Sequence, residues 1–249
     1  LPVVILDKVF RQSEGSIIAE NAQRIRHGNE QLEFSEDFQF WASADLQQSA
    51  QWLVRLYMDE VAKYGVDNVA LLTPFRKKSA TGVHDMNAAL HNLANPPAAD
   101  KGELELGQRL LRVGDKVMQM KNQDYASNGD VGYVCTAMRD SDGFLVEVDF
   151  GDDRVVAYED ADSLRQLDLA YANTIHKAQG SEYDAVLINI QNMHGRMLNR
   201  ALFYTAETRA KKRVIVVGDW EAVVRAIHAV DTSLRNTLLA ARIMDLIKK

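Results

Sequence analysis

Three nearly continuous apolar runs constrain the fold of this 249-residue chain more than any other feature of its sequence. They are NVALLTPF (68–75), YDAVLINI (183–190) and KRVIVVGD (212–219). A strand with one face in water alternates apolar and polar residues, so runs without alternation indicate strands that are covered on both faces. Segments with helical periodicity separate these runs. The sequence therefore predicts an α/β fold, in which helices flank a parallel sheet.

Capping residues mark the predicted helices. The segment DLQQSAQWLVRLYMDEVAKYG is amphipathic, Asp45 suits its N-cap, and Gly65 lies just past its last turn. Residues 16–28 have one apolar helical face and also end at a glycine. Further helices are predicted over 82–97 and 199–210 and twice after residue 219, a short strand is predicted at 2–6, and residues 30–42 are expected to be irregular.

The pattern of the sequence changes between Leu106 and Leu167. DKVMQMKNQ, GDVGYVCTAM, FLVEVDFGD and RVVAYE alternate as half-exposed strands do, and NGD and FGDD have the composition of tight turns. This pattern predicts a small antiparallel β-barrel at 106–167 that is inserted into the α/β domain. Residues 1–105 and 168–249 would then form the α/β domain itself.

Composition limits the partners that the chain can have. The net charge is −6 and the pI is near 5.6, whereas dedicated nucleic-acid modules are usually basic, so nucleic acid would have to bind in a local groove. No apolar run approaches the ~20 residues that span a bilayer, so no membrane partner is predicted. The single cysteine, Cys135, fits a reducing compartment. Because Leu1 opens directly onto an apolar run, we expect the sequence to be a fragment of a longer protein.

A dense group of polar residues precedes the second apolar run, in the stretch YANTIHKAQGSEYD. It places Thr174, His176, Lys177, Gly180 and Glu182 at the carboxyl end of a strand, where open α/β sheets bind ligands. Hydroxyl, imidazole and ammonium groups suit phosphate, and glycine lets a ligand approach the backbone. A solvated turn would explain any one of these residues, but not all of them in this order. The stretch therefore predicts a site for a phosphate-bearing ligand, with Glu182 facing a sugar hydroxyl or a base.

Two arginines stand at the ends of other predicted elements. Arg209 closes the helix of NRALFYTAETRA, where a cation either suits the helix dipole or acts as an arginine finger on a transferring γ-phosphate. Arg11 follows the first predicted strand in VFRQ, next to Gln12, and is as consistent with a surface arginine as with a functional one. Taken alone, the position of Arg209 favours the helix-dipole role, and that of Arg11 favours neither role.

Taken together, these stretches resemble the superfamily 1 helicases. YANTIHKAQGSEYDAVLI and LFYTAETRAKKRVIVVGD resemble motifs V and VI, and ILDKVFRQSEGSIIAENAQRIRHG resembles the segment that carries motif IV. TPFRKKSATGVHDMNAALHNLANP and RLLRVGDKVMQMKNQDYASNGDVGYV have counterparts in the RecD-like group, the family of the exodeoxyribonuclease V alpha chain. The resemblance runs from about residue 4 to about residue 219. It implies the second of two RecA-like lobes, with 106–167 matching a barrel of the Src-homology type that lies beside DNA.

The resemblance implies a set of residues at the nucleotide, which this family binds between its two lobes. Arg11 would match the motif IV arginine that contacts the phosphates, and Arg209 would match the motif VI arginine finger; both are predicted to be catalytic. Glu182 would match the motif V glutamate near the ribose. Gln12 and Gly180 are assigned to ATP binding with it.

A second set of residues is implied at the DNA. Thr174 and His176 would match positions that hold the backbone of single-stranded DNA, and Lys177 is assigned to the same role. Thr73, at the strand end before PFRKK, and Asn87 are also expected to face DNA. Single-stranded DNA is therefore the expected macromolecular ligand.

The phosphate-binding loop of the family does not occur in this sequence, which has no GxxxxGK[ST]. The amides that cradle phosphate and the carboxylate that holds Mg²⁺ would have to come from a missing N-terminal lobe. We therefore expect the full-length protein to use ATP and Mg²⁺, and this fragment alone to bind neither and to be inactive. The resemblance also implies the bacterial cytosol or nucleoid, a role in DNA repair and recombination, and a place for nuclease or helicase subunits of an exonuclease complex as partners.

Two other interpretations stay open at this point. The chain could be a non-enzymatic nucleic-acid-binding module with a degenerate helicase lobe, but Arg11, Glu182 and Arg209 would then have no chemical use. It could also be a lobe from another superfamily 1 branch, such as a conjugative relaxase-helicase or a phage helicase, since those share motifs like TIHKAQG. A P-loop in the full-length reading frame would exclude the first, and the stretch TPFRKKSATGVHDMNAALHNLANP favours the RecD-like group over the second.

Overall fold

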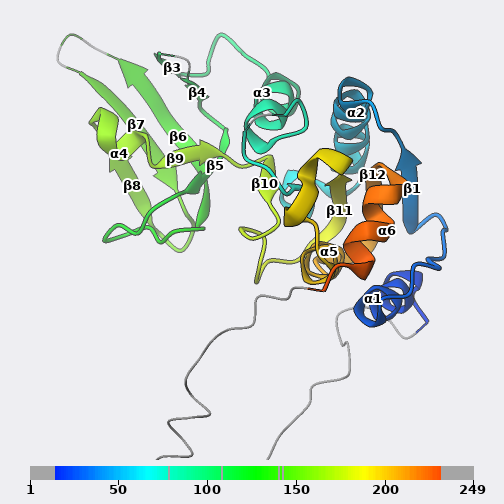
Figure 1. Ribbon diagram of the computed structural model, residues 1–249. Coiled ribbons are helices and arrows are strands. Elements are labelled where there is room, and N and C mark those ends of the chain that lie inside the picture. The colour runs from blue at the N-terminus through cyan, green and yellow to red at the C-terminus, as the bar shows by residue number, and fades with distance from the viewer. Residues whose placement is uncertain (1–14, 78, 108, 140, 142, 231–249) are drawn as a thin grey trace, which may run out of the picture.

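The computed structural model describes residues 15–77, 79–107, 109–139, 141 and 143–230. These residues form a parallel sheet with helices on both faces, here called the parallel lobe, and a group of antiparallel strands, here called the β-insert (Figure 1). The strand predicted at 2–6 and the last predicted helix lie outside the described residues.

Five parallel strands form the sheet of the parallel lobe, in the order β1-β12-β11-β2-β10. They are β1 (Phe38–Ala42), β2 (Val69–Thr73), β10 (Ala172–Thr174), β11 (Tyr183–Ile190) and β12 (Ala210–Gly218). The helices are α1 (Ile17–His27), α2 (Leu46–Tyr64), α3 (Val83–Ala94), α5 (Arg200–Glu207) and α6 (Trp220–His228), with short 3-10 segments η1 (Val66–Asn68) and η2 (Asn192–Met197). The predicted fold class, a RecA-like parallel sheet flanked by helices, is confirmed.

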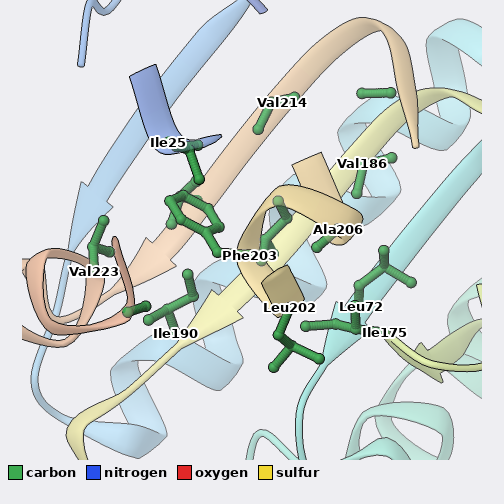
Figure 2. Packing of buried hydrophobic residues seen from close by; sticks show 14 of the residues in the cluster. Ile25, Leu72, Ile175, Val186, Ile190, Leu202, Phe203, Ala206, Val214 and Val223 are labelled. Carbon is green, nitrogen blue, oxygen red and sulfur yellow. The ribbon is translucent and has the colours of Figure 1, made fainter. Parts of the chain in front are cut away.

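Alternate residues of the central strands pack on opposite faces of this sheet. Leu71 and Leu187 pack against α2 and α3, whereas Leu72 and Ile188 pack against α1, α5 and α6. Figure 2 shows the core between the sheet and helices α1, α5 and α6, where Phe203 of α5 lies over the strands. Burial of each such side chain stabilises the fold by about 1.5–3 kcal/mol. The apolar runs do not alternate because both faces of each strand are covered.

Several helices and strands begin or end at residue types that can be identified in the sequence, namely a capping aspartate and glycines. The Asp45 carboxylate accepts a hydrogen bond from the backbone N–H of Gln48 at 2.6 Å and caps α2. α1 ends at Gly28, which adopts φ 76°, a left-handed angle that favours glycine. At the end of β12, a Cβ on Gly218 would lie 1.7 Å from the carbonyl oxygen of Ile190 in the neighbouring strand. Glycine is required there because no larger residue fits.

The prediction that residues 30–42 are irregular is wrong for their last part. Residues 38–42 form β1, which pairs in parallel with β12 from Phe38 to Ala42. Phe38 is the one buried residue of the five, because β1 lies at the edge of the sheet. An edge strand of this kind does not need the long apolar run that marks the central strands.

The β-insert contains two antiparallel sheets. A hairpin pairs β3 (Glu103–Leu106) with β4 (Arg109–Arg112). The larger sheet has the order β8-β7-β6-β5-β9 and consists of β5 (Lys116–Gln119), β6 (Val131–Arg139), β7 (Phe144–Asp149), β8 (Val155–Tyr158) and β9 (Leu167–Leu169), with the short helix α4 (Ala161–Leu164) before β9. The predicted antiparallel strands are confirmed, and the described ones extend from Glu103 to Leu169.

A short link returns the chain from β9 of the β-insert to β10 of the parallel lobe. The side-chain amide of Asn87, in α3, donates to the carbonyl oxygens of Leu169 (2.7 Å) and Ala172 (3.1 Å), and its oxygen accepts from the N–H of Ala172 at 2.7 Å. The hydroxyl of Tyr171, inside the link, donates to the Asp115 carboxylate of the β-insert at 3.1 Å. These bonds fix the β-insert beside the start of β10.

Candidate nucleic-acid interface

The polar stretch that follows β10 forms a tight turn. The backbone N–H of Lys177 donates to the carbonyl oxygen of Thr174 at 3.0 Å and lies 3.3 Å from its hydroxyl oxygen. Ile175 and Ala178 are buried in the core of the parallel lobe and anchor the turn. His176 is exposed and Thr174 is half-buried. The turn therefore keeps its apolar residues inside and presents its polar ones at the surface.

These polar side chains line a groove between the parallel lobe and the β-insert. The cavity has a volume of about 930 Å³, and Thr174 and His176 both line it. Five cationic side chains line it as well, and they define what is here called the basic groove: Arg76, Lys77, Arg109, Lys121 and Arg165. Two of them follow β2 and three belong to the β-insert, so the groove exists only because the two units lie side by side.

Asp168 is the one carboxylate among the described residues that line the basic groove. One of its oxygens accepts from Arg76 at 2.6 Å and the other accepts from Arg109 at 2.7 Å. Arg76 belongs to the parallel lobe and Arg109 starts β4, so a single carboxylate joins cations of the two units. The side chains of Arg76 and Arg109 are 51% and 38% exposed, which leaves both open to a ligand.

Burial and the charged residues of the basic groove shift the pKa values of two side chains in or beside it, Lys177 and His84. Partial burial lowers the pKa of the Lys177 ammonium, the nearby charge of Arg76 lowers it further, and Asp168 opposes both effects. Burial also lowers the pKa of His84, again with Asp168 acting in the opposite direction. The Lys177 ammonium donates to the side chain of Asn128 in the β-insert. A chain with a net charge of −6 thus concentrates positive charge in one groove.

The structure does not place Thr73 and Asn87 along the basic groove. Thr73 has 0% exposure, and its hydroxyl accepts from the side-chain amide of Asn189 at 3.1 Å. Asn87 is 5% exposed and holds the link after β9. Thr73 thus stabilises the end of β2 and Asn87 stabilises the start of β10. Their assignment as DNA contacts stays a prediction.

The far end of the same polar stretch meets Arg209, which is 9% exposed. Its Nε donates to the carbonyl oxygen of Thr205 at 3.1 Å, and one terminal nitrogen donates to that of Ser181, also at 3.1 Å. The carbonyl oxygen of Arg209 accepts from the N–H of Tyr183 at 2.9 Å. The end of α5 and the start of β11 are therefore joined through this one arginine.

Two more predicted residues lie next to this junction. The Glu182 carboxylate forms an ion pair with Lys211 at 3.2 Å. Gly180 adopts φ 92°, and a Cβ there would meet nothing within 4 Å, so the backbone angle and not a close neighbour requires glycine. The structure thus brings Gly180, Glu182 and Arg209 together. Arg11 and Gln12 lie outside the described residues, so their roles stay predictions.

Glu207 is a buried carboxyl that the sequence analysis did not single out. It has 0% exposure, and neither of its oxygens has a hydrogen-bond partner among the described residues. Burial raises the pKa of this carboxyl well above its usual range. Glu207 lies one helical turn after Phe203, so a helical projection of NRALFYTAETRA places it on the apolar face.

The cations of the basic groove were not predicted from the sequence. Arg76 and Lys77 lie in the loop after β2, separated from its end by two residues, and β2 is the parallel neighbour of β10. The rule that identified Thr174, a polar residue at the carboxyl end of a strand, applies equally to them. Arg109, Lys121 and Arg165 lie in separate parts of the β-insert, and no local pattern marks them, because only the fold brings them to one surface.

Neither a metal-binding cluster nor a membrane-spanning helix is found among the described residues. Within them, no group of three or more His, Cys, Asp or Glu side chains is placed to hold a metal ion. In the same residues, every helix is too short or too polar to cross a membrane.

Two family models match the chain. The UvrD-like helicase C-terminal domain matches residues 169–217, from β9 to β12, and so includes the turn after β10 and Arg209. The SH3 domain of ATP-dependent RecD-like DNA helicases matches residues 86–150, from α3 to β7. The first model includes Thr174 and His176 of the basic groove, and the second covers much of the β-insert.

Curated relatives agree with these models. The ATP-dependent RecD2 DNA helicase of Deinococcus radiodurans is 35% identical over 251 residues, which cover 97% of this chain and 32% of that protein. The RecBCD enzyme subunit RecD of Mycolicibacterium smegmatis is 43% identical over 99 residues, which cover 40% of this chain and 16% of that subunit. The chain thus spans about a third of the length of the first relative.

Solved structures share the fold. The Pif1 helicase from Bacteroides, in complex with ADP-AlF3 and single-stranded DNA, matches 98% of this chain and 56% of its own, with a TM-score of 0.50 at 18% identity. The Pif1 helicase from Candida albicans matches 96% of this chain and 60% of its own, with a TM-score of 0.50 at 17% identity. With the parallel lobe, the β-insert and both family models in agreement, this chain belongs to the RecD-like helicases of superfamily 1 and represents their C-terminal helicase region.

Proposed function

We propose that this chain is the C-terminal motor lobe of an ATP-dependent DNA helicase and that single-stranded DNA lies in its basic groove. The groove itself carries the proposal, because five cations from two units surround Thr174 and His176 on a chain that is acidic overall. Such grooves bind the phosphate backbone by releasing its counterions, whatever the base sequence. Lys177, at the edge of the groove, joins these contacts.

The relatives support this assignment. The protein of Deinococcus radiodurans is a DNA helicase that depends on ATP, and the Pif1 helicase from Bacteroides holds single-stranded DNA. The RecD relatives are subunits of the RecBCD enzyme, so we extend the proposal to nuclease and helicase subunits as partners and to DNA repair and recombination in the bacterial cytosol or nucleoid. Residues 1–105 and 168–249 would form the motor lobe, with 106–167 as its insert.

At the nucleotide, the chain would supply half of a site. A second lobe would hold ATP with its P-loop and Mg²⁺, and Arg209 and Arg11 would reach the γ-phosphate from this side. An arginine stabilises the charge that develops on the transferring phosphoryl group. Arg209 now bonds to neutral carbonyl oxygens, and a phosphate is a stronger acceptor than they are. Gln12, Gly180 and Glu182 would complete the nucleotide contacts.

The polar segment 174–182 would couple the two ligands. Its first residue lines the basic groove, and Ser181 near its other end accepts a hydrogen bond from Arg209. A movement of Arg209 toward ATP would break this bond and free that end of the segment. If the grip on DNA at Thr174 differs between the two states, each cycle of ATP hydrolysis produces a step.

The first experiment measures ATP hydrolysis with and without single-stranded DNA. The 249-residue chain is compared with a longer protein that also carries the P-loop lobe of its reading frame. We expect no turnover from the chain alone and DNA-stimulated turnover from the longer protein. Absence of ATP turnover in both proteins would instead support the interpretation as a non-enzymatic binding module.

A salt titration of DNA binding tests the groove independently of ATP. Replacing both Arg76 and Arg109 with alanine should reduce the slope of log affinity against log salt by about 1.4, since each cation on a single strand contributes about 0.7. Lys212→Ala is the matched control, because Lys212 is an exposed cation that pairs with Asp184 outside the groove. Equal slopes for the double variant and the wild type would place the DNA elsewhere.

A further inference from the structure

Asp168 occupies an unusual position for a carboxylate. It lies inside a groove whose other charged lining residues, among those described, are cations, and it pairs with two of them at 2.6 and 2.7 Å. A DNA-binding surface of this kind repels the phosphate backbone wherever it carries a carboxylate. The position of Asp168 therefore needs a reason other than charge complementarity to DNA.

The fold does not need these two ion pairs to hold the strand that carries Asp168. Its backbone is already paired in β9, opposite Met118 of β5, and Leu169 is bonded to Asn87. Arg109 also has a second partner, because it donates to the carbonyl oxygen of Leu164 at 3.1 Å. The two ion pairs therefore affect mainly Arg76. Its guanidinium is half exposed and is bonded to Asp168.

The chemistry of the pair resembles that of a phosphate contact. A carboxylate and a phosphodiester each offer two anionic oxygens, and both accept charge-assisted hydrogen bonds from guanidinium groups. Asp168 uses one oxygen for a cation of the parallel lobe and the other for a cation of the β-insert. A DNA phosphate that bridged the same two units would need the same donors.

We propose that Asp168 stands in the place of a DNA phosphate and competes with the DNA strand for Arg76 and Arg109. This inference rests on the proposed function, since it takes the basic groove as the DNA site. In the absence of DNA, the carboxylate neutralises the two guanidinium groups and joins the lobe to the insert. An incoming phosphate displaces it, first from Arg76. Asp168 thereby limits the affinity for DNA, so that the groove binds a strand firmly enough to grip it and weakly enough to release it.

The test compares Asp168→Asn with the wild type in the 249-residue chain. Binding of a fluorescently labelled oligothymidylate is followed by anisotropy from about 50 to 200 mM salt, a range in which phosphate contacts dominate affinity. Asn keeps the shape of Asp and removes its charge. We expect affinity to rise roughly tenfold near 100 mM salt, because a phosphate then binds Arg76 and Arg109 without first displacing a carboxylate.

Asp184→Asn is the matched control, since it removes one negative charge from an ion pair that does not line the basic groove. An equal gain in this control would show a general charge effect and overturn the proposal. A loss of affinity in Asp168→Asn would overturn it too, because the carboxylate would then position the arginines for DNA. An equal gain in a background that lacks both Arg76 and Arg109 would also contradict it, because Asp168 would then have no arginine to compete for.

The same titrations separate this inference from the proposed function. If Arg76→Ala with Arg109→Ala weakens binding while Asp168→Asn changes nothing, the groove is the DNA site and the competition is wrong. If none of these variants changes binding, or if neither the wild type nor Asp168→Asn binds DNA, both proposals fail. A thermal unfolding curve for each variant shows whether the protein is folded during the measurement.

Discussion

The two ends of one polar segment, residues 174–182, differ in the solvent exposure of the charged side chains beside them. At its start, Arg76 is 51% exposed and is bonded to a carboxylate that water also reaches. At its end, Arg209 is 9% exposed and is bonded to backbone carbonyl oxygens. Glu207, in the last turn of α5, has no exposure at all. The charges of the basic groove are open to exchange, whereas those at the end of α5 are enclosed.

This difference determines which conditions act on each end. Exposed ion pairs are screened by salt, so binding in the basic groove should depend strongly on ionic strength. Enclosed groups feel little of the solvent ions but are sensitive to geometry and to protonation. Salt should therefore act on the groove and pH on the end of α5. The predictions below test this division, from the largest effect to the smallest.

The largest effect is expected at Arg209. In the longer protein with a P-loop lobe, Arg209→Ala should lower ATP turnover by about 10³-fold while nucleotide binding stays largely intact, since an arginine finger acts on the transition state. Lys212→Ala serves as the control, because Lys212 is an exposed cation in β12, the strand that follows Arg209. Steady-state turnover and nucleotide affinity are measured for both. Near-normal turnover of Arg209→Ala would show that the enclosed arginine is structural.

Glu207 should produce the next largest effect, this time on stability. Because its pKa is raised in the folded state, the unfolded chain loses a proton above the usual glutamate pKa while the folded chain keeps it. The free energy of unfolding of the wild type therefore falls as pH rises above that value. Glu207→Leu removes this dependence and should stabilise the fold at neutral pH by about 1–3 kcal/mol, the cost of an unpaired buried polar group.

Denaturant unfolding at pH 5 and at pH 8 measures this effect. Glu221→Gln, on the exposed side of α6, is the control and should leave the pH dependence as it is in the wild type. A Glu207→Leu protein that is less stable than the wild type at pH 8 would mean that the carboxyl has a partner in solution. The end of α5 would then not be an enclosed site.

The smallest effect is expected from the turn after β10. Thr174→Ala combined with His176→Ala should weaken binding of single-stranded DNA by about fivefold and flatten its salt slope by less than 0.7, because a hydroxyl and an imidazole carry less charge than a guanidinium. The salt titration used for the groove measures both quantities. Gln179→Ala, an exposed residue of the same turn, is the control. An unchanged slope in the double variant would move the DNA contacts away from this turn.

The sequence predicted those features that local physics determines. Asp45 and Gly65 bound α2 because capping depends on adjacent residues, and Leu71 and Leu72 belong to a buried strand because both faces are apolar. β1 was missed because an edge strand obtains its backbone partners from β12 without needing an apolar run. The family was also recognised correctly from motifs that are short and contiguous.

The candidate site was less predictable because most of it is not contiguous. Thr174 and His176 stand in one motif and do line the basic groove, but Arg109 and Arg165 reach it only through the folding of the β-insert. Thr73 has the right residue type at a strand end, yet its hydroxyl is used by Asn189 in the interior. Whether a polar residue at such a position faces inward depends on its neighbours in space, which a single sequence does not show.

The link between β9 and β10 also has a mechanical consequence. Only the residues between Leu169 and Ala172 separate the two sheets, and β10 meets β2 over three residue pairs, ending at Thr174. A force that pulls the β-insert away from the parallel lobe is therefore transmitted to β10, and it loads the three residue pairs between β10 and β2 in shear. Asn87 is hydrogen-bonded to Leu169 and Ala172, where this force would reach β10. Tension in a DNA strand bound to the β-insert would therefore act first on Ala172 and then, through β10, on Thr174 at the start of the polar segment.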